Sequence, residues 1–223
     1  MSIKESTPLE YIVRIPKYST IGSPLLILLH GHGGNERDLL LLPNHYLDNW
    51  LVVSVRGAYN IGPNSYRWYD VKMFGGKIAI NIEEEEMTRK KLIGLIKDIS
   101  VKYMVDTNRI VVAGFSQGAN MAQSIGIGQP KLVSGFGVFS GRFIEEFIPY
   151  VNKSDDLKNM KAFLSHGTSD HMLPITYASE NKQELEKLGI QVTFSEDGNG
   201  HSISSKQVND FTEWLLSNYW KES

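Results

Sequence analysis

The sequence predicts an α/β fold in which a mostly parallel central sheet is covered by helices on both faces. Short runs of aliphatic residues without polar alternation recur along the chain, and helical segments fall between them. Strands that are buried on both faces have this continuous apolar character, and strand–helix alternation is typical of parallel sheets. The 223 residues, 41% hydrophobic and 22% charged, show no internal repeat and no linker. We therefore expect one domain that spans residues 1–223.

Seven segments are expected to form the sheet. Tyr11–Ile15 resembles a short edge strand, and Leu25–His30 (LLILLH) is a continuous apolar run that suits a strand buried on both faces. The later runs have the same character, with aliphatic or aromatic residues in sequence. They are Leu51–Val55, Arg109–Ala113, Val133–Phe139, Ala162–Ser165 and Gln191–Ser195.

The helices are expected between these strands. Asn81 can cap a helix whose first turn carries Glu83–Glu86, where carboxylates face the positive end of the helix dipole, and Arg89–Lys91 follow. We interpret this acidic run as a solvated helix start rather than a metal site. Gly189 stops a later helix. The other helical segments are Ala119–Ile125, Ile175–Leu188 and Ser205–Tyr219.

Two long segments show neither the periodicity of a helix nor that of a strand. Ala58–Ile80 is aromatic and rich in Gly and Asn, and Gly141–Met160 is partly irregular. Long segments without regular structure in a compact domain are commonly functional loops or lids, and plain surface loops are the alternative. Both interpretations stay open for these residues.

Charge and composition exclude several classes of protein. The net charge is −2, from 23 basic and 25 acidic residues, so no basic surplus exists to bind nucleic acid or an anionic membrane surface. The absence of cysteine removes disulfides, thiolate nucleophiles and cysteine metal sites. The N-terminus lacks the apolar segment of a signal peptide, and the longest aliphatic run there, Leu25–Leu29, is too short to span a bilayer. We expect a cytoplasmic protein without a membrane span.

A single serine stands between two glycines in Gly114-Phe115-Ser116-Gln117-Gly118, directly after the apolar run and directly before small residues. The G-x-S-x-G pattern alone is weak, but a strand before it and a helix after it are the setting that a nucleophile elbow requires. Strand and helix approach closely in such a turn, so side chains at Gly114 and Gly118 would clash. The pattern predicts an exposed Ser116 hydroxyl at the carboxyl end of the sheet, where open α/β folds bind ligands.

A serine nucleophile needs a base, and the base needs an acid that fixes its tautomer; in this architecture the chain order is serine, acid, histidine. His201 lies in the loop between the last strand and the last helix and is the expected base, whereas His166 ends a strand and His171 precedes the last strand. Asp170, in a loop that ends at the helix-starting Pro174, is the expected acid. Other carboxylates are surrounded by lysines or too close in sequence to the histidine: Asp155, Asp156, Glu196 and Asp197.

Two backbone amides are expected to bind the oxyanion. One is the N–H of Gln117, after the nucleophile, and the other is the N–H of His32 in the glycine-rich loop His30–Asn35. That loop does not continue as a dinucleotide-binding G-x-G-x-x-G, and no phosphate-binding P-loop occurs in the chain. No histidine or carboxylate spacing supports a metal site, so we expect neither a metal nor a cofactor.

In these motifs the chain resembles the small carboxylesterase branch of the α/β-hydrolase fold, related to acyl-protein thioesterases and lysophospholipase-like esterases. The resemblance runs from Leu9 to Tyr219 and also includes Arg67-Trp68-Tyr69-Asp70, which is similar to the family's Trp-Phe-Asp segment near the acyl pocket. It implies an α/β-hydrolase fold without a large cap domain. Its most specific pieces are Leu28–Leu40, Asn108–Ala122, His166–Pro174 and Gly200–Ser204.

The resemblance implies the same site that chain order predicts. Ser116 would be the nucleophile, Asp170 the acid and His201 the base, with the amides of His32 and Gln117 as oxyanion hole. Trp68 and Met172 fall where the family lines its substrate cleft. The chain departs from the family at three positions. The family commonly has an apolar residue in place of His32, often has proline in place of His171, and commonly has an acidic residue in place of Ser202. Both imidazoles make the cleft more polar if they line it, and they have no such effect if they point to solvent.

We therefore expect a serine hydrolase that cleaves carboxylic esters or thioesters of small molecules through an acyl-enzyme, as a monomer or homodimer. An acyltransferase or peptidase that uses the same three residues is one alternative. A non-catalytic ligand-binding protein with this fold is another.

Overall fold

The computed structural model describes residues 9–40, 42, 47–74, 77–151 and 154–219. The N-terminal segment considered for a signal peptide therefore lies partly outside the described residues, as do residues 75–76 and 152–153 of the two long segments. Within the described residues, none of the helices combines the length and the apolar character that a membrane crossing requires.

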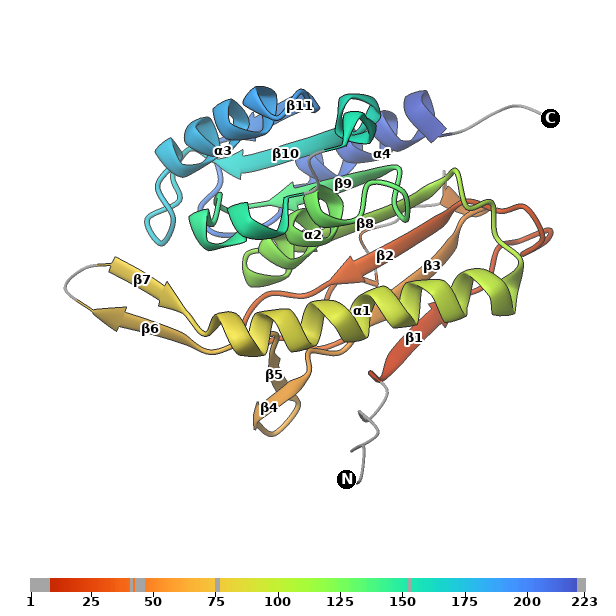
Figure 1. Cartoon of the computed structure of the whole chain (residues 1–223), viewed down its shortest axis with the longest axis horizontal. Helices are drawn as coiled ribbons and strands as arrows, with labels where there is room; N and C mark the ends of the chain where they lie inside the picture. The colour runs from red at the N-terminus through yellow and green to blue at the C-terminus, as the bar shows by residue number, and fades with distance from the viewer. Residues whose placement is uncertain (1–8, 41, 43–46, 75–76, 152–153, 220–223) are drawn as a thin grey trace.

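A seven-stranded sheet forms the centre of the molecule, in the order β1-β3-β2-β8-β9-β10-β11 (Figure 1). All neighbours are parallel except β1, which pairs antiparallel with β3 at the edge, so the predicted edge strand and parallel sheet are confirmed. The strands are β1 Tyr11–Arg14, β2 Leu25–Leu29, β3 Leu51–Val55, β8 Ile110–Phe115, β9 Gly135–Phe139, β10 Lys161–Gly167 and β11 Gln191–Asp197.

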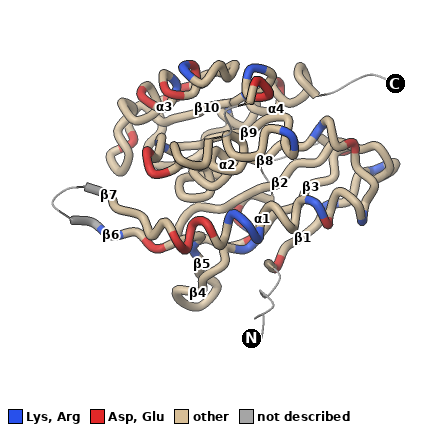
Figure 2. Tube along the Cα trace, viewed as in Figure 1, with Lys and Arg blue, Asp and Glu red and all other residues tan. Residues whose placement is uncertain are grey.

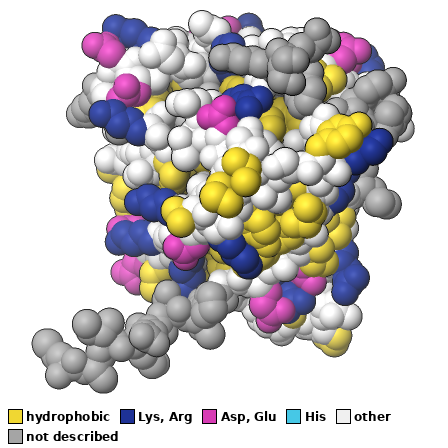
Figure 3. Space-filling view, turned by 90° about the vertical axis from the view of Figure 1, so that its right-hand side faces the viewer, with side chains coloured by type: hydrophobic (Ala, Val, Ile, Leu, Met, Phe, Trp, Pro, Cys, Tyr) yellow, Lys and Arg dark blue, Asp and Glu magenta, His cyan; other side chains and the backbone are white. Residues whose placement is uncertain are grey.

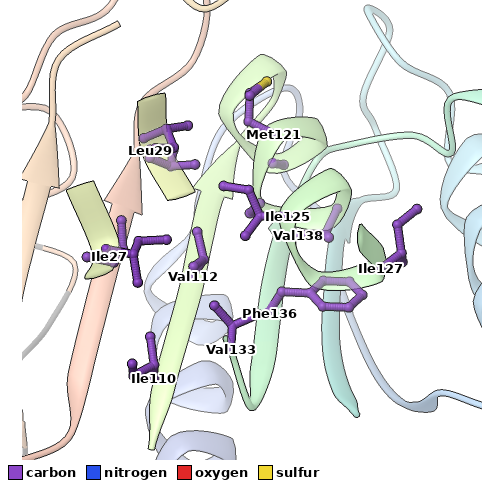
Figure 4. Close-up of a cluster of buried hydrophobic side chains, with 14 of the residues drawn as sticks. Ile27, Leu29, Ile110, Val112, Met121, Ile125, Ile127, Val133, Phe136 and Val138 are labelled. Atoms are coloured by element: carbon purple, nitrogen blue, oxygen red, sulfur yellow. The ribbon is translucent and has the colours of Figure 1, made fainter. Parts of the chain in front are cut away.

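Helices cover both faces of the sheet, as expected. Two separate clusters of buried side chains show this, because successive residues of a strand point to opposite faces. Ile27 and Leu29 of β2 pack with α1, α2 and α3, whereas Leu26 and Leu28 pack with α4. Figure 4 shows the first cluster between α2 and the central strands. The helices are α1 Ile82–Tyr103, α2 Gln117–Gly128, α3 Thr176–Lys187 and α4 Ser205–Tyr219.

The helix ends follow the expected chemistry with two corrections. Asn81 caps α1 by accepting a hydrogen bond from the Glu84 N–H, and Gly189, at φ +82°, follows the end of α3. However, α3 begins at Thr176, so Pro174 precedes the helix instead of opening it.

The acidic start of α1, followed by basic residues, is visible in Figure 2. Its interpretation as wholly solvated is wrong for Glu85, which is buried, accepts a 2.6 Å hydrogen bond from Ser124 and pairs with Arg89.

The segment Ala58–Ile80 is not an irregular loop. It forms two hairpins, β4 Tyr59–Gly62 with β5 Ser65–Arg67, and β6 Val71–Phe74 with β7 Lys77–Ile80, which extend from the carboxyl side of the sheet (Figure 1). Their strands have only three or four residues, and glycine and asparagine at the turns hide the alternation. Gly141–Met160 is partly irregular as expected and contains two short 3₁₀ helices, at Glu145–Tyr150 and Asp155–Asn159.

Candidate active site

The chain turns sharply at Ser116, between the end of β8 and the start of α2. Ser116 has φ +53° and ψ −115°, a backbone conformation that L-residues rarely adopt. Its N–H donates a 2.8 Å hydrogen bond to the Phe139 carbonyl of the neighbouring strand β9, which helps to hold the turn. The serine therefore lies at the carboxyl edge of the sheet with α2 directly behind it.

The two glycines of the elbow leave no space for a side chain. A Cβ on Gly114 would lie 2.3 Å from the backbone of Gly118, and a Cβ on Gly118 would lie 2.2 Å from the carbonyl oxygen of Leu29. Real Cβ atoms never approach so closely, so only glycine fits at either position. The predicted steric reason for the glycines is confirmed, and the clash at Gly118 is with Leu29 of β2 and with His30, which follows it.

His201 reaches Ser116 from a loop 85 residues further along the chain. Its Nε2 lies 3.0 Å from Ser116 Oγ, and its ring packs against Phe115 with the ring centroids 4.9 Å apart. The loop before α4 lies tightly against the end of β10, where a Cβ on Gly167 would be 2.2 Å from the Asn199 carbonyl. This close approach brings the histidine loop beside the loop that carries Asp170.

Asp170 is buried and uses both of its carboxylate oxygens. Oδ2 lies 2.7 Å from His201 Nδ1, and Oδ1 accepts hydrogen bonds from the N–H groups of Met172 and Leu173 at 2.9 and 2.8 Å. Burial alone would raise its pKa, but the hydrogen bonds from Leu173, His201 and Met172 outweigh burial and lower the pKa below its ordinary value. Asp170 therefore stays ionised and holds Nδ1–H, which leaves Nε2 to accept a proton.

Of the other histidines and carboxylates considered, His166 lies nearest to this chain of hydrogen bonds, with its Nε2 3.5 Å from Asp170 Oδ2. His166 is buried and its Nε2 donates to the Leu173 carbonyl at 2.7 Å, so it supports the loop that carries Asp170. Glu196 and Asp197 belong to β11, and Asp155 pairs with Lys158 at the surface. Among the described residues, no group of three His, Asp or Glu side chains could hold a metal ion.

The loop after β2 faces the elbow and is held at several points. His30 is fully buried; burial lowers its pKa, so it is neutral and its Nε2 accepts the Gly57 N–H at 2.9 Å. Gly33, at φ +84°, donates to the Tyr66 carbonyl of hairpin β4–β5. Among the described residues, no hydrogen bond uses the N–H of His32, and the N–H of Gln117 is the first of α2 and has no acceptor within the helix. Both amides are thus available to an oxyanion.

A cavity of about 530 Å³ opens beside Ser116 and His201. Its walls come from the elbow, the loop after β2, hairpin β6–β7, the Met172 loop and the segment after β9. The lining residues are Gly31, His32, Tyr69, Val71, Ile78, Ile80, Phe115, Ser116, Gln117, Asn120, Arg142, Met172, Leu173 and His201.

The expected cleft residues have different outcomes. Met172 lines the cavity and is largely exposed. Trp68 does not line it: the side chain is fully buried, its indole N–H donates to the His30 carbonyl, and its backbone N–H donates to Gln117 Oε1. The hydrogen bond to His30 satisfies the indole N–H and so allows the ring to be buried. Trp68 therefore packs behind the site and contacts the elbow and the loop after β2 without lining the cavity. His32 lines the cavity, whereas His171 is exposed and lies outside it.

Sequence reasoning missed most of the walls. Ile78 and Ile80 are two positions apart, as residues on one face of a strand are, but Lys77–Ile80 is too short for this spacing to identify a strand in the sequence. Asn120 and Arg142 carried no comparable signal, because only the folded chain brings the end of β9 beside α2.

At the opposite ends of the strands, the described residues form no comparable group. Figure 3 views the end where the parallel strands begin, and among the side chains that it colours by type, hydrophobic residues and mixed charges are visible and no histidine is seen. Two hollows of about 320 and 470 Å³, around Asn108 and Ser134, lie far from Ser116. Ser116, His201 and Asp170, which hydrogen bonds link to one another, all lie at the carboxyl ends of the strands.

Comparisons with known proteins show what the chain is similar to. The phospholipase/carboxylesterase family model matches residues 13–218. The chain is similar to lysophospholipase-like protein 1 of Mus musculus, with 24% identity over 208 residues and 87% of each chain covered. It is similar to acyl-protein thioesterase 1 of Emericella nidulans, with 29% identity over 85% of this chain and 88% of the relative. The crystal structure of the Bacillus cereus carboxylesterase matches 94% of both chains with a TM-score of 0.80 and 25% identity.

Proposed function

The chain belongs to the phospholipase/carboxylesterase family and is a hydrolase, and from that premise we propose that it cleaves carboxylic esters or thioesters through an acyl-enzyme on Ser116. One observation carries the proposal. Hydrogen-bond distances of 3.0 and 2.7 Å link Ser116 Oγ to His201 and His201 to buried Asp170, beside a cavity large enough for a small substrate.

The proposed reaction has two halves. Ser116 Oγ attacks the substrate carbonyl as His201 Nε2 takes its proton, and Asp170 stabilises the imidazolium that results. The imidazolium then donates the proton to the leaving alcohol or thiol, and the acyl group stays on the serine. Water, deprotonated by the same nitrogen, cleaves the acyl-enzyme, releases the acid and restores the Ser116 hydroxyl.

The negative oxygen formed in each half needs donors. The N–H groups of His32 and Gln117 are the proposed pair, since neither has a partner among the described residues and both flank Ser116. The start of α2 adds positive potential at the same point. Removal of one such donor costs roughly 2.7–4 kcal/mol of barrier in a comparable serine hydrolase.

Product analysis during turnover tests this proposal. With 4-nitrophenyl acetate we expect a rapid burst of one nitrophenolate per active site, then slower release of acetate to water. Added alcohols and amines test the acyltransferase alternative, and an amide substrate tests the peptidase. A chain that releases no acetate to water and forms no acetyl adduct on Ser116, or that transfers acetyl to an acceptor in preference to water, contradicts the proposed hydrolysis.

A further inference from the structure

Arg142 is a cationic residue in the wall of the cavity. Among the described residues that line the cavity, it is the one arginine or lysine, and no described aspartate or glutamate joins it there. Among the described residues no carboxylate forms an ion pair with it. A half-buried guanidinium without a counter-charge, beside a reacting serine, is a recognition element for an anion.

The backbone is shaped to hold Arg142 at this place. Ser140 has φ +50°, and its N–H donates to the Ser165 carbonyl. A Cβ on Gly141 would lie 2.7 Å from Val138 and 2.9 Å from Ala119, so the chain crosses α2 in close contact. This unusual turn carries the chain from the end of β9 directly to the cavity.

Asn120 ties Arg142 to the nucleophile's own helix. Asn120 Oδ1 accepts the Arg142 N–H at 3.0 Å, and Asn120 Nδ2 donates to the Tyr69 hydroxyl at 3.3 Å. Because Asn120 is four residues after Ser116 and its N–H bonds to the Ser116 carbonyl, the arginine backbone is fixed relative to the reacting serine.

The guanidinium keeps donors for a ligand. Its hydrogen bonds to the described residues are two long ones, 3.4 Å to the Phe143 carbonyl and 3.4 Å to the Ile78 carbonyl, against an ordinary range of about 2.7–3.2 Å. A guanidinium has five N–H donors, arranged to match a carboxylate. The remaining walls are largely apolar, from Val71, Ile78, Ile80, Met172 and Leu173, and suit a short hydrocarbon spacer.

We propose that Arg142 binds a carboxylate of the substrate, so that this hydrolase prefers esters whose acyl or alcohol part ends in a carboxylate. The inference rests on the proposed function, because it concerns the substrate of the same serine. Matched esters test it. Methyl hydrogen adipate carries the carboxylate on the acyl side, with methyl adipamate as its uncharged partner; 4-acetoxybutyrate carries it on the alcohol side, with 4-acetoxybutyramide as its partner.

Acid release, followed by pH-stat titration, gives kcat/KM for each ester. We expect the carboxylate ester to exceed its amide about tenfold in one arm, which identifies the side that binds Arg142. Arg142→Gln should remove that preference, so that the carboxylate ester and its amide have kcat/KM values within about twofold of each other, and Arg142→Lys should keep part of it. Lys97→Gln, which removes an exposed charge of α1 outside the cavity, should change neither value.

Two results would overturn the inference: equal kcat/KM for charged and uncharged esters in both arms of the wild type, or a parallel loss for both esters in Arg142→Gln. Failure of the proposed function is a different result, since no ester would then be hydrolysed. Calorimetric binding of methyl hydrogen adipate and of 4-acetoxybutyrate to Ser116→Ala separates the two cases, because it needs no turnover. We expect Ser116→Ala to bind one of these two esters about tenfold more tightly than the double variant with Arg142→Gln does.

Discussion

Two walls of the same cavity are built in opposite ways. At the elbow, backbone atoms of β2, β8 and α2 approach so closely that Gly114 and Gly118 accept no side chain. On another wall, Ile78 and Ile80 are only half-buried and belong to strand β7, whose one partner strand among the described residues is β6. The nucleophile is therefore held by tightly packed backbone of the central sheet and α2, whereas Ile78 and Ile80 of the apolar wall lie on a hairpin outside that sheet.

From this difference we expect that the rate of the reaction and the preference among substrates depend on different residues. Substitutions at the elbow should affect every substrate alike, because they alter the position or the presence of a reacting atom. Substitutions in the hairpin wall should alter the ranking of substrates, because they change only what the substrate touches. Each prediction below tests one side of that contrast.

The largest effect is expected at Ser116. Ser116→Ala removes the nucleophile, and we expect kcat to fall on the order of 10⁶-fold for every ester, as it does in other serine hydrolases. The measurement is steady-state hydrolysis of 4-nitrophenyl esters from acetyl to octanoyl. Ser179→Ala, an exposed serine of α3, is the control and should be unaffected. Activity of Ser116→Ala within tenfold of the wild type would exclude Ser116 as the nucleophile.

Asp170→Asn should have the next largest effect. The amide cannot hold His201 Nδ1–H, so the imidazole adopts the wrong tautomer and kcat should fall about 10⁴-fold. Far-UV circular dichroism verifies that the variant folds, and Asp155→Asn at the surface is the matched control. If Glu196→Gln abolished activity while Asp170→Asn was mild, Glu196 and not Asp170 would be the acid.

Gly118→Ala tests the rigid wall without removing a reacting group. The added Cβ would lie 2.2 Å from the Leu29 carbonyl, and we expect a loss of about 3 kcal/mol in the free energy of unfolding. Urea unfolding followed by fluorescence measures it. Gly198→Ala is the control, because a Cβ there meets nothing within 4 Å. Equal stability of the two variants would show that the elbow is less tightly packed than described.

Ile78→Ala tests the hairpin wall. The smaller side chain leaves part of the apolar wall unfilled, so kcat/KM for a butyryl ester should fall about threefold to tenfold while that for an acetyl ester barely changes. Ile61→Ala, in hairpin β4–β5 outside the cavity, should leave kcat/KM unchanged for both the butyryl and the acetyl ester. A uniform loss for all chain lengths in Ile78→Ala would mean that the two walls are not separable.

The smallest effect concerns the loop after β2. Hydrogen bonds from Arg56 hold the pKa of Glu36 at about 2, against an ordinary value of 4.5. A lowered pKa in the folded state stabilises the protein above the ordinary pKa, and the contribution is lost as the pH falls from 4.5 to about 2. The Tm difference between wild type and Glu36→Gln should therefore be constant above pH 4.5 and shrink below it. A difference that is independent of pH would contradict the ion pair.

The sheet and its order of helices were predictable because buried parallel strands have continuous aliphatic sequences and α/β units alternate. Ser116, Asp170 and His201 were predictable as candidates because an elbow needs its glycines and the chain order is constrained. The hairpins were missed since strands of three or four residues have no strong period. Glu85 and Trp68 were misjudged because their burial depends on partners from distant segments, Ser124 and the His30 carbonyl, which local pattern does not reveal.

The most direct test of the account is covalent labelling with a fluorophosphonate, read by intact mass and peptide mapping. The phosphonate reacts with a serine only when a base removes its proton and the oxyanion is stabilised. We predict one adduct per chain, on Ser116, formed at least 10³-fold more slowly in His201→Ala. No adduct, an adduct on another residue, or equal labelling of His201→Ala would contradict the claim that His201 activates Ser116.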